Sequence, residues 1–148
     1  MNKLRGNELK KGATFSWLTS AVTTEQLARY AGASDDYNRI HYDDAYAREA
    51  GLGGVVAHGM LTMGFMARAL VEWAGNPICV QSISARFTAV VRPGDVVEVK
   101  LVVEESTQSH SVDFSLQAFV QSKTVALGQA RINLQSTLQP MGSNRKMS

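Results

Sequence analysis

An acidic side chain and an imidazole stand five positions apart in this chain, at Asp36 and His41. A second polar pair, His58 and Gly59, leads directly into an apolar stretch. Carboxyl and imidazole groups transfer protons, and a backbone N–H at a helix start can bind an oxyanion. These residue types together predict chemistry beside a carbonyl group, in which one proton moves and negative charge grows on the carbonyl oxygen.

The two proton-transfer candidates can meet only if the chain between them is bent. In a regular helix five residues turn through about 500°, which leaves the two side chains roughly 140° apart. Residues 35–38 are of types that favour turns, so we expect a bend that brings Asp36 and His41 to one pocket. An imidazole can accept or donate a proton near neutral pH, whereas a carboxyl group is an acid there only when burial favours its neutral form.

Length and composition are those of an ordinary globular domain. The chain has 148 residues, 45% hydrophobic and 19% charged, with a formal net charge of +2. We expect a single domain over residues 1–138 and a flexible tail over 139–148. The small net charge predicts no nucleic-acid partner, and no apolar run is long enough to predict a membrane partner. The one cysteine, Cys79, is expected to be buried, and the absence of an apolar leader predicts a cytoplasmic location.

Two short helices are expected before the second polar pair. Thr23 and Gln26 have the spacing of a capping box, and the helix that they open is expected to end at Gly32. A second helix is expected from residue 43 or 44 to residue 51. The glycine-rich segment 51–54 then predicts a flexible connection.

A third, longer helix is expected over residues 59–74, ended by the segment 75–77. It is apolar on nearly every side, which is typical of a helix that other elements wrap. Gly64 lies inside it and weakens it by roughly 1 kcal/mol relative to alanine. We therefore expect a neighbouring backbone or ligand to approach closely at Gly64.

After residue 77 the hydrophobic period changes to that of β-strands. Four runs alternate apolar with polar or small residues. These runs lie at residues 83–91, 97–103, 112–120 and 126–134. The segment Arg92–Asp95 has proline and glycine where a type II turn favours them, and a first strand is expected at Thr14–Leu18. The pattern predicts an α+β hot-dog fold, an antiparallel sheet wrapped around a central buried helix.

The segments that contain Asp36, His41, His58 and Gly59 resemble the MaoC-like hydratase/dehydratase family. This family includes (R)-specific enoyl-CoA hydratases and (3R)-hydroxyacyl-ACP dehydratases. The likeness is carried by residues 30–41, 57–64 and 86–95, and it covers about residues 10–135. It looks especially similar to the catalytic subunits of the mycobacterial hydroxyacyl-ACP dehydratases. The D-x-N-x-x-H and H-G-M blocks are specific together, whereas either alone would be weak.

The resemblance implies roles for individual residues. Asp36 and His41 match the family's catalytic acid/base pair, and Gly59 matches the glycine whose N–H faces the thioester oxygen. Asn38 matches the asparagine of the motif. We place Gly59, Asn38 and His58 in the oxyanion and substrate-binding set, and we expect His58 to cap or pack beside the helix start.

One position departs from the family pattern. The family has proline after the asparagine, and this chain has Arg39. The change restores a backbone N–H and removes the ring that fixes φ. Two consequences stay open: a different geometry of the bend, or a polar substrate that the guanidinium reaches, as in a specialised dehydratase that tailors a polyketide-type substrate.

The predicted activity is that of a lyase. It would dehydrate (R)-3-hydroxyacyl thioesters and hydrate trans-2-enoyl thioesters, carried on CoA or on acyl carrier protein (ACP), without cofactor or metal. We expect His41 to accept the proton in dehydration and Asp36 to hold and protonate the hydroxyl, although the two can titrate as one unit. The resemblance also implies a dimer, expected to be a homodimer, with a heterodimer with a sister subunit as the alternative.

Three other functions fit parts of the pattern. A hot-dog thioesterase would use a carboxylate to direct water to the carbonyl carbon. A metal enzyme could draw two imidazoles and a carboxylate from His41, His58 and Asp36. A non-catalytic partner subunit would leave the acid/base pair without a purpose.

Overall fold

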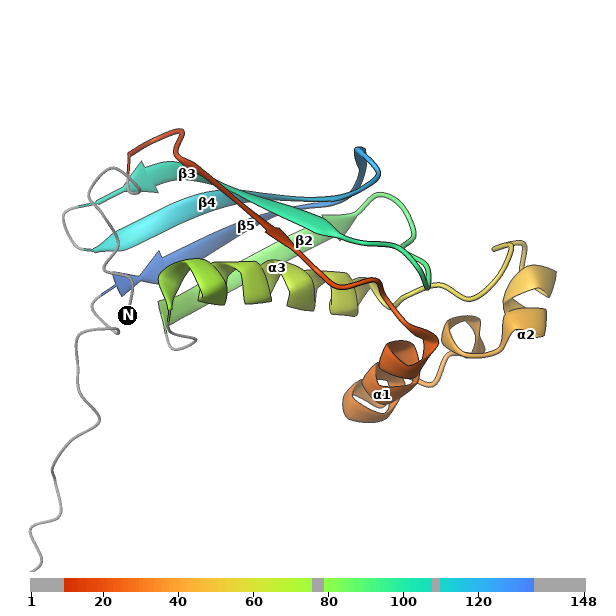
Figure 1. Ribbon diagram of the computed structural model, residues 1–148. Helices are drawn as coiled ribbons and strands as arrows, with labels where there is room; N and C mark the ends of the chain where they lie inside the picture. The colour runs from red at the N-terminus through yellow and green to blue at the C-terminus, as the bar shows by residue number, and fades with distance from the viewer. Residues whose placement is uncertain (1–9, 76–78, 108–109, 135–148) are drawn as a thin grey trace, which may run out of the picture.

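A computed structural model describes residues 10–75, 79–107 and 110–134 of the chain. Five antiparallel strands form one sheet in the order β1-β3-β4-β5-β2, and a long helix, α3, lies along one face of it (Figure 1). The strands are β1 (Thr14–Leu18), β2 (Val80–Phe87), β3 (Glu98–Ser106), β4 (Ser111–Val120) and β5 (Lys123–Asn133). The helices are α1 (Thr24–Ser34), α2 (Asp44–Glu49) and α3 (Gly59–Ala74), with a 3₁₀ turn, η2 (Arg39–His41), between α1 and α2.

The core lies between α3 and the sheet. Alternate residues of β3 and β4 are buried, which is the period of a strand with one covered face. Against them pack the buried residues of α3, which are Leu61, Thr62, Phe65, Met66, Ala69 and Leu70. Cys79 is buried in the same core, as expected. The sheet and the helix confirm the predicted α+β hot-dog fold.

One face of α3 differs from the prediction of a fully wrapped helix. Met60 is 53% exposed, and Gly64, Arg68 and Glu72 continue the exposed stripe at helical spacing. Among the described residues, no atom lies within 4 Å of the place where a Cβ at Gly64 would stand. The close approach predicted at Gly64 is therefore not made by the described part of the chain, because a single sheet covers only one side of the helix.

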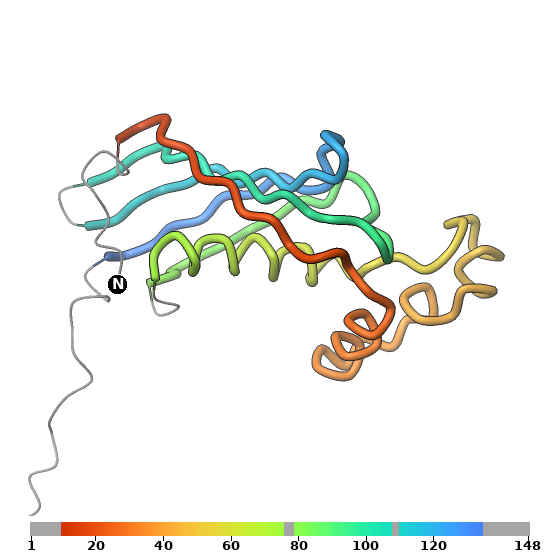
Figure 2. The backbone as a smooth tube through the Cα atoms, in the orientation of Figure 1, coloured from red at the N-terminus to blue at the C-terminus, as the bar shows by residue number. Residues whose placement is uncertain are grey.

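The connecting segments gather at one end of the sheet. The chain passes from β1 directly into α1, and α1 and α2 lie beyond the sheet near the first turn of α3 (Figure 2). At the turn before β3, Asp95 N–H donates to the Arg92 carbonyl over 3.1 Å. Gly94 has a φ of +95° there, which agrees with the predicted type II turn. This end of the fold therefore brings the two polar blocks of the sequence together.

The ends of α1 and α2 agree only in part with those predicted from the sequence. Thr23 Oγ1 accepts from the Gln26 N–H over 3.1 Å, as predicted. The predicted end at Gly32 is wrong, because Gly32 stays helical and Asp35 takes the left-handed conformation that ends α1, with a φ of 57°. The second helix stops at Glu49, two residues before the predicted end.

None of the helices in the described part of the chain could span a membrane. The predicted C-terminal tail, residues 139–148, lies outside the described residues, as do Asn76 and Pro77 of the segment predicted to end the third helix.

Replacement of Leu70 by alanine tests the packing of α3 on the sheet. Leu70 is 0% exposed, so the cavity left by Leu70→Ala should lower the free energy of unfolding by about 2–5 kcal/mol. The same change at Leu18, which is 62% exposed, should cost no more than about 0.5 kcal/mol. Urea unfolding of both variants measures the difference. Equal costs would contradict the burial of α3.

Candidate active site

Two side-chain turns bend the chain between α1 and His41. Asp36 Oδ1 accepts from the Asn38 N–H over 3.2 Å, and Asn38 Oδ1 accepts from the Ile40 N–H over 3.2 Å. Each is a carboxylate or amide oxygen bonded to the backbone two residues on, which reverses the chain locally. The second turn starts η2, and His41 is its last residue. The segment therefore leaves the helix, as the spacing of Asp36 and His41 required.

The bend brings the Asp36 carboxylate close to the His41 imidazole. His41 Nε2 lies 3.9 Å from Asp36 Oδ2, with the His41 side chain 9% exposed and that of Asp36 52% exposed. This separation is too long for a direct hydrogen bond. Two atoms 3.9 Å apart can, however, both lie within hydrogen-bond distance of one oxygen placed beside them. The distance suits a hydroxyl group or a water molecule that bridges the two side chains.

The backbone sets which nitrogen of His41 carries hydrogen. His41 Nδ1 lies 2.7 Å from the carbonyl oxygen of Val56. A carbonyl oxygen can only accept, so Nδ1 is the donor, and in the neutral ring Nε2 has the lone pair. That lone pair is on the side of Asp36. In the neutral ring, His41 Nε2 can therefore accept a proton on the side of Asp36.

His58 is buried against His41 and contacts the backbone, not the carboxylate, of Asp36. Its ring is 2% exposed, and its Nε2 lies 3.1 Å from the backbone oxygen of Asp36. The ring stacks on His41 with 3.6 Å between centroids and 20° between planes. The Tyr30 ring contacts His58 in an edge-to-face arrangement, with 4.8 Å between centroids and 63° between planes. These contacts agree with the expectation that His58 packs beside the start of α3.

Gly59 is the first residue of α3. The side chain of His58, the preceding residue, makes no cap hydrogen bond, and no hydrogen bond to an acceptor is found for the Gly59 N–H among the described residues. Such an N–H is at the positive end of the helix dipole. A Cβ at this position would lie 2.8 Å from the ring of Phe87, so the glycine is also needed for packing.

Arg39 points to α2 and not to the Asp36–His41 pair. Its Nη2 lies 2.6 Å from Asp43 Oδ2, and its guanidinium lies 4.5 Å from the ring centroid of Tyr46. Asp43 caps α2 by accepting from the Tyr46 N–H over 3.0 Å. The N–H of Tyr46, and next the guanidinium of Arg39, lower the pKa of Asp43. Of the two consequences left open, the structure favours an altered way of holding the bend.

The donor atoms of Asp36, His41 and His58 lie within 4.8 Å of one another, which makes them the one candidate metal cluster of the described residues. Metal ligands point their lone pairs at one centre about 2.0–2.2 Å away. Here the two rings are stacked, and lone pairs in the planes of stacked rings run side by side. His41 Nδ1 and His58 Nε2 are also engaged with carbonyl oxygens. The arrangement suits proton transfer better than metal binding.

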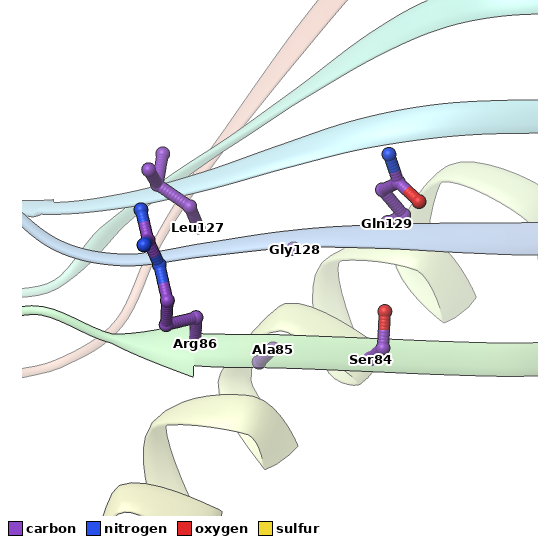
Figure 3. A pocket seen from close by; sticks show the side chains of 6 residues that line it. All are labelled: Ser84, Ala85, Arg86, Leu127, Gly128 and Gln129. Carbon is purple, nitrogen blue, oxygen red and sulfur yellow. The ribbon is translucent and has the colours of Figure 1, made fainter.

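A hollow of about 350 Å³ lies elsewhere, between β2 and β5. Figure 3 shows that the side chains of Ser84, Arg86 and Gln129 point to the side of the sheet away from α3. None of the predicted site residues lines it. The hollow is therefore a feature of the outer sheet surface.

Three features of the site were not predicted from the sequence. They are the Val56 carbonyl that orients His41, the edge contact of Tyr30 with His58, and the Phe87 ring over Gly59. The first is a backbone atom fifteen residues away and leaves no signal in residue type. Phe87 fell within a predicted strand, but its contact with Gly59 depends on tertiary structure.

Comparisons with known proteins agree with this geometry. The family model described as MaoC like domain matches residues 8–124. An (R)-specific enoyl-CoA hydratase of Rhodospirillum rubrum is 29% identical over 84% of this chain and 88% of its own length. The peroxisomal enoyl-CoA hydratase 2 of Arabidopsis thaliana is 33% identical over 64% of this chain. The first curated relatives are longer, and the chain spans 30% or less of each.

Several solved structures are similar in sequence as well as in fold, with identities of 28–30%. The unliganded R-hydratase PhaJ1 of Pseudomonas aeruginosa superimposes with a TM-score of 0.78 at 30% identity. The match covers 85% of this chain and 82% of that one. The family match over residues 8–124 includes the elements that build the site.

The ion pair between Arg39 and Asp43 predicts a pH dependence. Because the pKa of Asp43 is lowered in the folded chain, the stability that Asp43 contributes is complete above its ordinary range and is lost as the pH falls through the lowered pKa. Carbon-13 NMR of the Asp43 carboxyl should show a midpoint below 3.8. Arg39→Gln should raise this midpoint only part of the way, because the Tyr46 N–H remains.

Asp44 is the internal control for this titration, because its own lowered pKa is due first to Arg48. Its midpoint should move much less than that of Asp43 in Arg39→Gln, because Arg48 is the first cause and the charge of Asp43 acts on it only weakly. An unchanged midpoint for Asp43 would show that Arg39 does not hold this carboxylate in solution.

Proposed function

This chain belongs to the MaoC-like domain family, and we propose that it is a hydro-lyase acting on (R)-3-hydroxyacyl and trans-2-enoyl thioesters. The observation that carries the proposal is the bond from His41 Nδ1 to the Val56 carbonyl, which leaves Nε2 to accept a proton beside Asp36. The names of the relatives from Rhodospirillum rubrum and Pseudomonas aeruginosa support the same reaction.

In the dehydration direction, His41 Nε2 takes the proton from C2 of the thioester. Asp36, in its acid form, holds the C3 hydroxyl and gives it a proton, so that the C3–O bond breaks and water leaves. The imidazolium of His41 then returns its proton to the carboxylate through a water molecule that bridges the two side chains, which lie 3.9 Å apart. Hydration runs the same steps in reverse. General acid–base catalysis of this kind typically contributes 10²–10⁴-fold to the rate.

The role of Asp36 as the acid requires that its carboxyl group be buried when the substrate is bound. Asp36 is half exposed in the single chain, so a bound thioester must exclude water from it before it can act as an acid. Asn38 is assigned a local role, because its side-chain oxygen is engaged with the Ile40 N–H. It holds the bend on which the pair depends.

The Gly59 N–H is assigned to the thioester oxygen. Negative charge grows on that oxygen when the C2 proton leaves, and an N–H at the start of α3 faces it with the positive end of the helix dipole. Donors of this kind are worth about 2.7–4 kcal/mol of transition-state stabilisation. The Phe87 ring beside Gly59 gives the donor an apolar neighbour.

The proposal also covers the carrier of the acyl group, the oligomeric state of the chain and its place in the cell. The substrate is carried on CoA or ACP, and the reaction takes place in the cytoplasm. A second copy of the chain forms a homodimer that covers the exposed stripe of α3, where Met60 is 53% exposed and Gly64 offers room for close approach. A sister subunit in place of the second copy would give a heterodimer.

Kinetics of site variants test the proposed activity. Asp36→Asn and His41→Ala should each lower the hydration rate of a short-chain enoyl thioester by about 10²–10⁴-fold, because each removes one proton carrier. The measurement is the loss of ultraviolet absorbance of the enoyl thioester, and circular dichroism checks that the variants are folded.

Asp35→Asn is the matched control, because Asp35 is the exposed neighbour of Asp36 and asparagine also tolerates its left-handed φ of 57°. It should keep nearly the full rate. Wild-type rates in the Asp36 or His41 variants would refute the assignment. Release of free thiol, without loss of the enoyl group, would instead identify a thioesterase.

A further inference from the structure

We propose that His58 is a positioning residue that sets the distance between Asp36 and His41. The proposal rests on the proposed function and assigns this residue a part in it other than contact with the substrate. One buried ring touches both members of the proton-transfer pair, since its Nε2 faces the Asp36 backbone oxygen and its face covers the ring of His41. His58 is itself buried, with 2% of its surface exposed, so it acts through these two neighbours.

The contacts of His58 define its protonation. Its Nε2 lies 3.1 Å from a carbonyl oxygen, so Nε2 carries hydrogen. Its Nδ1 is buried and has no hydrogen-bond partner among the described residues. A proton on Nδ1 would place an unpaired charge in the interior, which costs far more than a lone pair left without a donor. The ring is therefore neutral, with hydrogen on Nε2, whereas His41 has hydrogen on Nδ1.

A neutral His58 suits the charge that forms on its neighbour. When His41 accepts a proton, the imidazolium lies 3.6 Å from the face of the His58 ring, measured between centroids. A cation over an aromatic face is attracted to it, whereas a second imidazolium there would be repelled. Tyr30 meets the same ring edge-on and holds it in place. The stack thus supports the protonated intermediate without taking the proton.

The backbone of His58 joins this arrangement to the oxyanion donor. Its carbonyl oxygen accepts from the Leu61 and Thr62 N–H groups at the start of α3, and the next residue is Gly59. The carboxylate, the imidazole and the Gly59 N–H are therefore all held by one residue. A displacement of about 1 Å in such a set can cost roughly 10²-fold in rate.

The two tautomers can be measured without any substrate. In the wild-type chain, proton–nitrogen NMR of the imidazole rings at a pH where both are neutral should show His58 with hydrogen on Nε2 and His41 with hydrogen on Nδ1. His58 with hydrogen on Nδ1 would overturn the proposal. Because this measurement needs no turnover, it can fail or succeed independently of the proposed function.

Two variants separate the contacts of His58. His58→Phe keeps a ring for the stack but removes the donor to Asp36, and His58→Gln keeps an N–H donor near the position of Nε2. We expect His58→Phe to lower kcat by roughly 10²-fold with KM changed by no more than about twofold. His58→Gln should recover part of the lost kcat.

Thr62→Val is the control for a general loss of packing, because Thr62 is buried one turn further along α3 at 3% exposure. It should leave kcat unchanged. A rise in KM with unchanged kcat in His58→Phe would mean that His58 binds the substrate directly and would overturn the proposal. Unchanged values of both constants would overturn it as well, and thermal unfolding confirms that each variant is folded.

Discussion

The hydrogen bond from His41 Nδ1 to the Val56 carbonyl is the interaction on which the site depends. It spans 2.7 Å and fixes both the tautomer and the plane of the imidazole. The same two segments are joined a second time, because the Val56 N–H donates to the Ile40 carbonyl over 3.1 Å. The next residue, Ala57, donates to the Val91 carbonyl over 2.7 Å. A base carried on a short 3₁₀ turn is thereby tied to the segment that follows the edge strand β2.

The scaffold accounts for the rest of the geometry. The sheet buries one side of α3, so the first turn of that helix has a fixed place at the end of the sheet where α1 and α2 lie (Figure 1). Phe87 lies against Gly59 closely enough that a Cβ there would clash with its ring. The Arg92 guanidinium donates to the Leu52 and Gly54 carbonyls and secures the loop before α3. Rigid elements therefore set the position of the donor, while a bent segment brings the acid and the base to it.

Much of this arrangement was predictable from the sequence, because its signals are local. The bounds of α3 follow from an apolar stretch between Gly59 and Gly75, and β1 was expected at the residues where it is found. The end of α1 was not predictable in this way, since Gly32 is a stronger stop signal than Asp35, which ends the helix. Arg39 likewise gave no sign of its partners, Asp43 and Tyr46. Its ion pair with Asp43 and its contact with the Tyr46 ring tie the bend to α2.

The central claim is that one substrate oxygen lies between the carboxylate and the imidazole while a second lies on the helix start. The most direct measurement is a structure of the Asp36→Asn chain with a bound 3-hydroxyacyl thioester. We expect the C3 hydroxyl at about 2.7–3.2 Å from both residue 36 and His41 Nε2, with the thioester oxygen at the same distance from the Gly59 N–H. A thioester bound elsewhere, or a hydroxyl in contact with neither side chain, would contradict it.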